Sequence, residues 1–175
     1  MSWSVNRYDL SYSSPLLCCV SEDSLDVGPF TEDQVNSFLS FVSMMSPNRS
    51  EWKERFRLDC VEEKLPLAMP LLHRYECKGI VQLMKGILRI APTPKAIYSI
   101  LLYKEEGECT EWLDKKGMKV LMRYCIWGGR PYTESANPLE EINEKISKLP
   151  TRITSFFLIE LCEIARTDPY SVCSV

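Results

Sequence analysis

The spacing of apolar residues predicts a helix that begins at Thr31. Thr31 and Gln34 have the spacing of a capping box, in which each side chain binds the backbone N–H of the other residue. Two acidic residues follow in the first turn, where the helix dipole favours them, and Pro47 ends the pattern. The apolar stripe consists of Val35, Phe38, Leu39 and Val42.

A second amphipathic helix is predicted over residues 71–90, and Pro92 and Pro94 stop it. Its apolar residues follow the spacing of one helix face, and cationic and amide side chains share the opposite face. We therefore expect this helix to pack on a core and to turn a basic side outward. The apolar set is Ile80, Leu83, Met84 and Ile87, and the outer set is Lys78, Gln82, Lys85 and Arg89.

Three segments favour β-strands. Residues 55–61 fit either a helix or an alternating strand, and we favour the strand because Leu58 and Cys60 then lie on one apolar side. Residues 95–104 and 119–127 are short runs rich in β-branched and aromatic side chains. A polar connection that contains a glycine joins the last two, so we expect them to pair antiparallel.

The last third of the chain is predicted to be helical. One helix has a cap and a proline at its start and a narrow apolar stripe, and a second, more apolar helix follows Pro150 and ends before Asp168. The cap is Asn137, the proline is Pro138, and the stripe is Leu139, Ile142 and Ile146.

These elements predict one α+β domain over residues 31–170, in which amphipathic helices pack on a small antiparallel sheet. Residues 1–30 show no sustained period and predict an irregular arm, and residues 171–175 form a C-terminal tail. The length of 175 residues and the apolar content of 45% suit a single domain that buries roughly 70% of its unfolded surface.

The eight cysteines are interpreted as reduced, mostly buried thiols of an intracellular protein. This interpretation rests on the N-terminus, which lacks the charged start and the unbroken apolar core of a signal peptide. The longest apolar runs fall far short of the ~20 residues that span a bilayer, so any membrane contact is expected to be peripheral.

Charge is segregated along the chain. Residues 74–130 carry 11 Lys and Arg against 6 Asp and Glu, whereas residues 1–73 carry 6 against 11 and residues 131–175 carry 4 against 7. The net charge of −3 therefore hides a basic middle, which favours an anionic partner such as RNA, nucleoprotein or a lipid headgroup. The residues expected to bind it are Lys78, Lys85, Arg89, Lys115, Lys116, Lys119 and Arg123.

No catalytic or metal site is predicted. His73 is the single histidine, and the chain has no glycine-rich phosphate loop, no G-x-S-x-G and no H-E-x-x-H. Cys60, His73 and Cys77 have a finger-like spacing, but no C-x-x-C accompanies them. We therefore expect neither enzymatic activity, nor a bound metal, nor a cofactor.

Leu58, Cys60 and Glu62 form an L-x-C-x-E string, which resembles the motif by which several viral proteins dock the retinoblastoma pocket. Such docking strings are extended and exposed in acidic, flexible surroundings. Here the flanking residues are basic and the string overlaps the strand predicted over residues 55–61, so we expect a buried segment. A small viral adaptor that binds a host cell-cycle regulator is the alternative.

The element order predicted for residues 55–128 resembles the globular core of rhabdovirus matrix proteins, in particular the small plant-infecting members. It runs from a strand to the basic helix over residues 78–90, through the proline-containing break at residues 91–94, to the two further strands. The resemblance implies a multivalent structural protein that condenses the nucleocapsid, binds membrane and self-associates, without an active site.

We therefore expect a non-enzymatic viral structural protein that bridges nucleoprotein or RNA and an anionic membrane surface through its basic face. Its expected location is the host cytoplasm and the virion.

Overall fold

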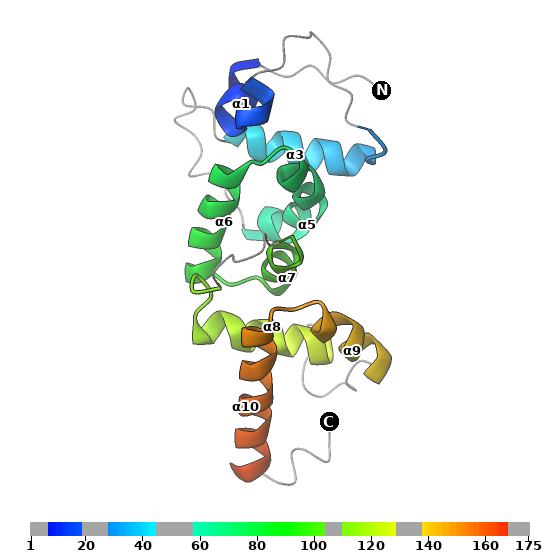
Figure 1. Cartoon of the computed structure of the whole chain (residues 1–175), viewed down its shortest axis with the longest axis vertical. Coiled ribbons are helices and arrows are strands. Elements are labelled where there is room, and N and C mark those ends of the chain that lie inside the picture. The colour runs from blue at the N-terminus through cyan, green and yellow to red at the C-terminus, as the bar shows by residue number, and fades with distance from the viewer. Residues whose placement is uncertain (1–6, 19–27, 45–57, 104–109, 129–137, 168–175) are drawn as a thin grey trace. The chain divides into compact units, whose positions relative to one another are not determined.

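The computed structural model describes residues 7–18, 28–44, 58–103, 110–128 and 138–167 (Figure 1). Within these ranges every secondary-structure element is a helix. The predicted α+β class with an antiparallel sheet is therefore wrong. The chain divides into two compact units, Met1–Ile87 and Leu88–Val175, so that the single domain predicted for residues 31–170 is shared between them.

The first unit contains α1 (Arg7–Ser13), α2 (Pro15–Cys18), α3 (Glu32–Met44), α5 (Leu58–Arg74) and most of α6 (Lys78–Ile90). Its core forms where α3 packs against α5. Phe38, Phe41 and Val42 of α3 are buried, and the ring of Phe38 lies 5.7 Å from that of Tyr75. Three residues of the stripe predicted for this helix, Val35, Phe38 and Val42, are therefore in the core, whereas Leu39 is only partly buried and the buried Phe41 was not predicted.

The predicted capping box at the start of α3 is confirmed. The N–H of Thr31 donates to Oε1 of Gln34 at 2.9 Å, and the N–H of Gln34 donates to Oγ1 of Thr31 at 3.3 Å. Both groups would otherwise lack a partner in the first turn of the helix, so the box fixes where α3 begins.

The strand predicted over residues 55–61 is wrong from residue 58 onward, because α5 begins at Leu58; residues 55–57 lie outside the described ranges. Pro66 and Pro70 lie inside this helix, although each proline removes a backbone hydrogen bond at a cost of about 3 kcal/mol. The helix nevertheless buries a continuous apolar side. The buried residues of α5 are Val61, Leu65, Ala68, Met69, Leu71 and Leu72.

The helix predicted over residues 71–90 is two helices, with a break between Arg74 and Lys78. Glu76 adopts a left-handed conformation with φ of 51°, and the N–H of Cys77 donates to the carbonyl of Leu72 at 2.9 Å. The N–H of Glu76 also donates to the carbonyl of His73 at 3.1 Å. This is a Schellman motif, which usually has glycine at the left-handed position, so the glutamate hid the helix end in the sequence.

The arm predicted to be irregular is helical over residues 7–18 apart from Ser14, which separates α1 from α2. The hydroxyl of Ser14 is buried and donates to the carbonyl of Tyr75, and it accepts the N–H of Leu17 at 3.3 Å. One side chain thus starts α2 and attaches this segment to the break after α5.

The second unit contains α7 (Pro94–Leu102), α8 (Lys115–Trp127), α9 (Leu139–Ser147) and α10 (Thr151–Thr167). The first two occupy residues predicted to be paired strands, so the hairpin over residues 95–127 is also wrong. In α7, Pro94 takes the first helical position, where its fixed φ and missing N–H favour a helix.

Helix α8 is defined by its two ends. The carboxylate of Asp114 accepts the N–H of Gly117 at 2.8 Å, and Gly128 follows the last turn in a left-handed conformation with φ of 64°. The buried residues of α8 have the spacing of one helix face and not the alternating spacing expected for a strand. They are Gly117, Leu121, Met122, Cys125, Ile126 and Trp127.

Helices α7, α9 and α10 each pack against α8. Tyr98 of α7 lies 6.0 Å from the ring of Tyr124 and donates its hydroxyl to the carbonyl of Lys145 at 3.2 Å. The ammonium of Lys145 lies 4.8 Å from the centre of the Tyr124 ring. These contacts hold one side of α9 against α8. The cap predicted at Asn137 lies outside the described residues, and Pro138 directly precedes the helix.

Replacement of Gly128 by Ala should lower the free energy of unfolding by roughly 1 kcal/mol, because a side chain is strained at its positive φ. Gly86→Ala is the matched control. Gly86 lies in α6 with open space around its Cα, so alanine there should raise stability by roughly 0.5–1 kcal/mol. Urea titrations of both variants measure the two shifts, and a stabilising Gly128→Ala would contradict the assigned helix end.

Candidate functional site

Four of the seven basic residues expected to bind an anionic partner lie together on α8. Lys115, Lys116, Lys119 and Arg123 fall on one side of a helix with 3.6 residues per turn. We call this set the cationic face. Each of its side chains is exposed or partly exposed, so the face is accessible within the second unit.

The other three basic residues are on α6, and they do not form the exposed stripe that was predicted. Lys78 and Arg89 are exposed, but Lys85 between them is only 4% exposed. The expectation that Lys85 lies on the outer side is wrong. Lys78 and Lys85 also belong to the first unit, whereas the cationic face belongs to the second.

Glu160 of α10 neutralises part of the cationic face. Its carboxylate accepts a hydrogen bond from Nζ of Lys115 at 3.0 Å and from Nζ of Lys119 at 2.9 Å, although its side chain is only 6% exposed. Hydrogen bonds from Lys119 and then Lys115 lower the pKa of Glu160, and the same contact raises the pKa of Lys115. One buried carboxylate thus anchors α10 to the first half of α8.

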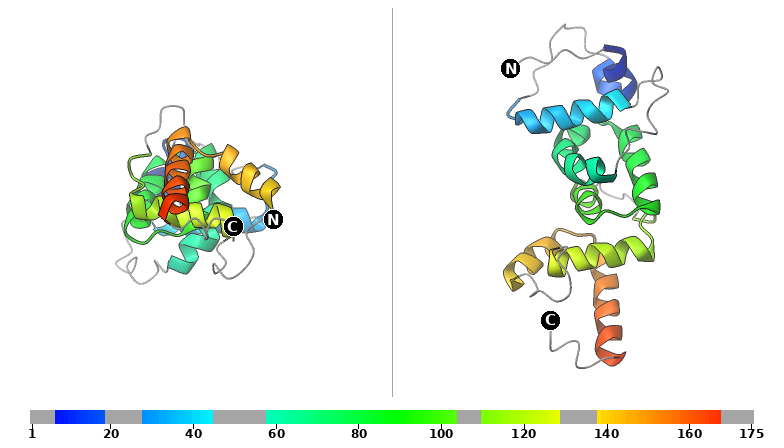
Figure 2. Two further views of the ribbon diagram at one scale, coloured as in Figure 1. Left: turned by 90° about the horizontal axis from the view of Figure 1, so that it is seen from below. Right: turned by 180° about the vertical axis from the view of Figure 1, so that it is seen from behind.

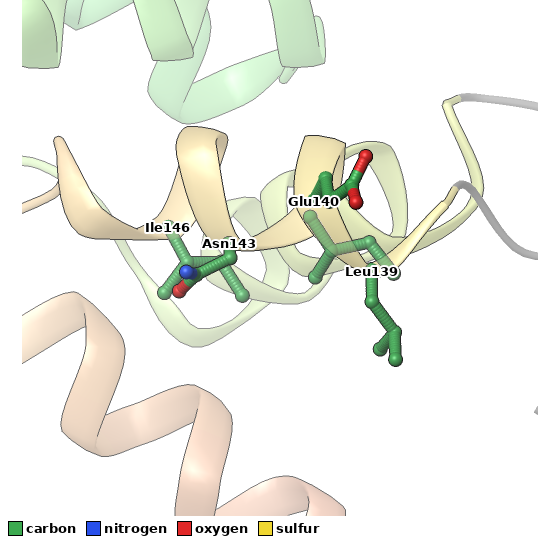
Figure 3. A pocket seen from close by; sticks show the side chains of 5 residues that line it. Leu139, Glu140, Asn143 and Ile146 are labelled. Carbon is green, nitrogen blue, oxygen red and sulfur yellow. The ribbon is translucent and has the colours of Figure 1, made fainter.

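Helix α9 carries an uncovered apolar stripe. Leu139, Ile142 and Ile146 line an open pocket of about 470 Å³, together with Glu140 and Asn143 (Figure 3). Leu139 is 83% exposed, and no residue of α9 is buried. The stripe was predicted correctly as a set, but its residues are not core residues.

Helix α10 is apolar on two opposite sides. Ile153 and Phe157 are buried toward the rest of the unit, on the same side as Glu160. Leu158 and Ile159 are 65% and 58% exposed on the other side. Cys162, one turn further along that side, is also exposed. We call Leu158, Ile159 and Cys162 the outer stripe of α10.

The outer stripe continues where α10 has little cover. The buried residues of this helix all lie between Ile153 and Glu160, and beyond Glu160 no described side chain is buried. Figures 1 and 2 show the C-terminal half of α10 extending away from α8. The apolar surface of the second unit therefore consists of the α9 stripe and the outer stripe of α10.

The two buried thiols, Cys77 and Cys125, do not have the properties of nucleophiles. Burial raises the pKa of Cys77 to about 12, against a smaller lowering by a hydrogen bond with Ser14. Burial likewise raises the pKa of Cys125 to about 12, against a smaller lowering by Lys145. A nucleophilic cysteine needs a lowered pKa, so neither thiol is prepared for that chemistry.

The described residues contain no cluster of three or more His, Cys, Asp or Glu side chains that could hold a metal ion. In the same ranges, no helix is both long and apolar enough to cross a membrane.

The L-x-C-x-E string occupies the first turn of α5, where the backbone is helical from Leu58 onward. Glu62 is partly exposed, and the side chains of Leu58 and Cys60 lie outside the described part of the chain. The string would have to unwind from the helix to dock as an extended segment.

The chain matches no family model, and the searches of curated proteins and of solved structures also found no match. The function must therefore be argued from the surfaces described above.

The pairing of Glu160 with two lysines predicts an acid-dependent stability. Because the pKa of this carboxylate is lowered on folding, its stabilising contribution is present above the ordinary carboxyl pKa of 4.5 and disappears as the pH falls below it. Glu160→Gln should therefore melt below the wild type at neutral pH, and the difference should close in acid. Thermal melts across this pH range measure it, and a difference independent of pH would contradict the pairing.

Proposed function

We propose that this chain is a non-enzymatic interaction protein whose second unit binds a macromolecular partner through the apolar surface of α9 and α10. The observation that carries the proposal is the exposure of Leu139, Leu158 and Ile159, each more than half exposed. Stripes of exposed apolar side chains on a folded protein are typical of an interaction site.

Burial would supply the driving force for binding. Covering a leucine or isoleucine side chain contributes about 1.5–3 kcal/mol relative to leaving it in water. Three such side chains on α9 and α10 therefore contribute favourably to binding when a partner covers them. The pocket on α9 is open, and its mixed rim of Glu140 and Asn143 suits the side chains of a partner helix.

Substitution of Leu139, Leu158 and Ile159 by Ser should remove the partner without unfolding the chain. The three side chains are exposed, so their loss leaves the core intact. Affinity purification from the cells that produce the protein, followed by quantitative mass spectrometry, should lose its specific partners in the triple variant. Circular dichroism should report unchanged helicity and melting temperature.

Ile90→Ser is the matched control, because Ile90 is an isoleucine with 82% exposure outside α9 and α10. This variant should retain every partner that the wild type binds. An identical set of partners for the wild type and the triple variant would exclude the apolar surface as the binding site.

A second candidate is binding to an anionic partner through the cationic face, which is favoured by the alignment of four basic residues on α8. The viral matrix role, with nucleocapsid and membrane as partners in the host cytoplasm and virion, belongs to this candidate. It rests on the family resemblance, and the strands from which that resemblance was drawn are helices wherever the structure describes them. The cell-cycle adaptor rests on the L-x-C-x-E string, which would have to leave the helical conformation that it has from Leu58 onward in order to dock as an extended segment.

The cationic face predicts binding to RNA or to anionic vesicles that weakens steeply with salt. Lys116→Glu combined with Arg123→Glu should abolish it, because these substitutions leave Lys115 and Lys119 with Glu160. Lys95→Glu, on the exposed side of α7, is the control for net charge. Co-sedimentation at low and high salt measures the effect, and equal binding by the double variant and the control would contradict this candidate.

A further inference from the structure

We propose that the partner which covers the α9 stripe is the outer stripe of α10 in a second copy of this chain. The inference rests on the proposed function and specifies its partner. It starts from the fact that the second unit carries two uncovered apolar stripes on two different helices. One is a stripe with an open pocket, and the other is a ridge on a helix that extends away from α8 (Figure 1).

The charges beside the two stripes are complementary. Glu140 lines the pocket at the start of α9, and Arg166 lies one turn beyond Cys162 on the outer side of α10. Both side chains are exposed, and neither forms an ion pair within the described residues. Glu163, the acid closest to Arg166 on that helix, acts electrostatically on Lys115. An antiparallel contact would join Glu140 to Arg166 of the other copy.

Residues within and beside the two stripes have spacings that fit the same antiparallel direction. Glu140, Asn143 and Ile146 follow one another along α9 at intervals of three residues. Arg166, Cys162 and Ile159 follow one another in the reverse direction along α10 at intervals of four and three. Residues three and four apart share a helix face, so the three pairs can meet in register. Antiparallel alignment also opposes the two helix dipoles favourably.

The contact joins two different surfaces. Each copy therefore offers its α9 stripe for one contact and its outer stripe of α10 for another. A second identical contact either closes a dimer or extends a chain of copies. Two short helices bury less than the roughly 1,200 Å² at the low end of specific interfaces, so the association should be reversible and depend on concentration.

Sedimentation velocity of the full chain over a concentration series tests the association. Leu158→Asp should weaken it at least about tenfold, because a charge would enter the apolar contact. Glu140→Arg and Arg166→Glu should each weaken it about threefold, and their combination should restore it, as expected for a directly paired set of charges. A chain that stays monomeric at every concentration overturns the inference.

Disulfide trapping tests the register. A tagged Asn143→Cys/Cys162→Ser variant, mixed with untagged wild type and oxidised, should form a mixed disulfide between its introduced thiol and Cys162 of the wild type. The same variant mixed with an untagged Cys162→Ser chain should form no mixed disulfide. This mixture is the control for disulfides that involve the other cysteines. A disulfide between Cys162 of two wild-type copies would place two α10 helices together and overturn the inference.

The two proposals fail in different ways. If the chain is monomeric but the Leu139/Leu158/Ile159 variant still loses its copurified partners, self-association is wrong and the interaction surface stands. If the chain is monomeric and that variant keeps all its partners, both are wrong.

Discussion

The second unit depends on α8, against which α7, α9 and α10 all pack. A helix has a limited surface, and α8 must also keep one side charged, since Lys115, Lys116, Lys119 and Arg123 occupy it. The rest of the surface of α8 carries the buried residues Leu121, Met122, Cys125 and Ile126. Because one side of α8 is charged, only its apolar side is available to cover the apolar side chains of three neighbouring helices. The α9 stripe and the outer stripe of α10 are among the side chains that α8 leaves uncovered.

Glu160 decides which side of α10 is left uncovered. With Lys115 and Lys119 as its partners, this carboxylate holds its side of the helix against α8. A rotation of α10 that buried Leu158 and Ile159 would carry Glu160 into solvent and would separate it from both lysines. Both sides of the helix carry apolar side chains, and the ion pairs favour the orientation that is observed.

Local signals in the sequence predicted several elements correctly. The capping box of Thr31 and Gln34 located α3, and the periodicity of residues 78–90 located α6. The β-branched and aromatic content of residues 95–104 and 119–127 predicts strands, but signals for the ends of helices are also present around these segments. Pro94 at a helix start, Asp114 as a cap and Gly128 after the last turn together indicate two helices.

Other features had no local signal. The left-handed Glu76 gives no sign of a helix end in the sequence, and the burial of Lys85 depends on tertiary packing. Glu160 lies on α10 and its two lysine partners lie on α8, with α9 between these helices in the sequence, so only the fold brings the charges together. The α9 stripe was visible as a pattern, but periodicity does not distinguish a face that meets the core from one that meets another molecule.

The outer stripe of α10 lies on the opposite side of that helix from Glu160, which pairs with two lysines of the cationic face. A partner on the outer stripe would therefore leave Lys116 and Arg123 accessible. If copies associate through α9 and α10, each assembly presents several cationic faces at once. Linked faces raise the effective concentration of a second contact, which increases the overall affinity by about 10²- to 10⁴-fold in multivalent systems. The proposed self-association would therefore strengthen the proposed anion binding without any new contact to the anion.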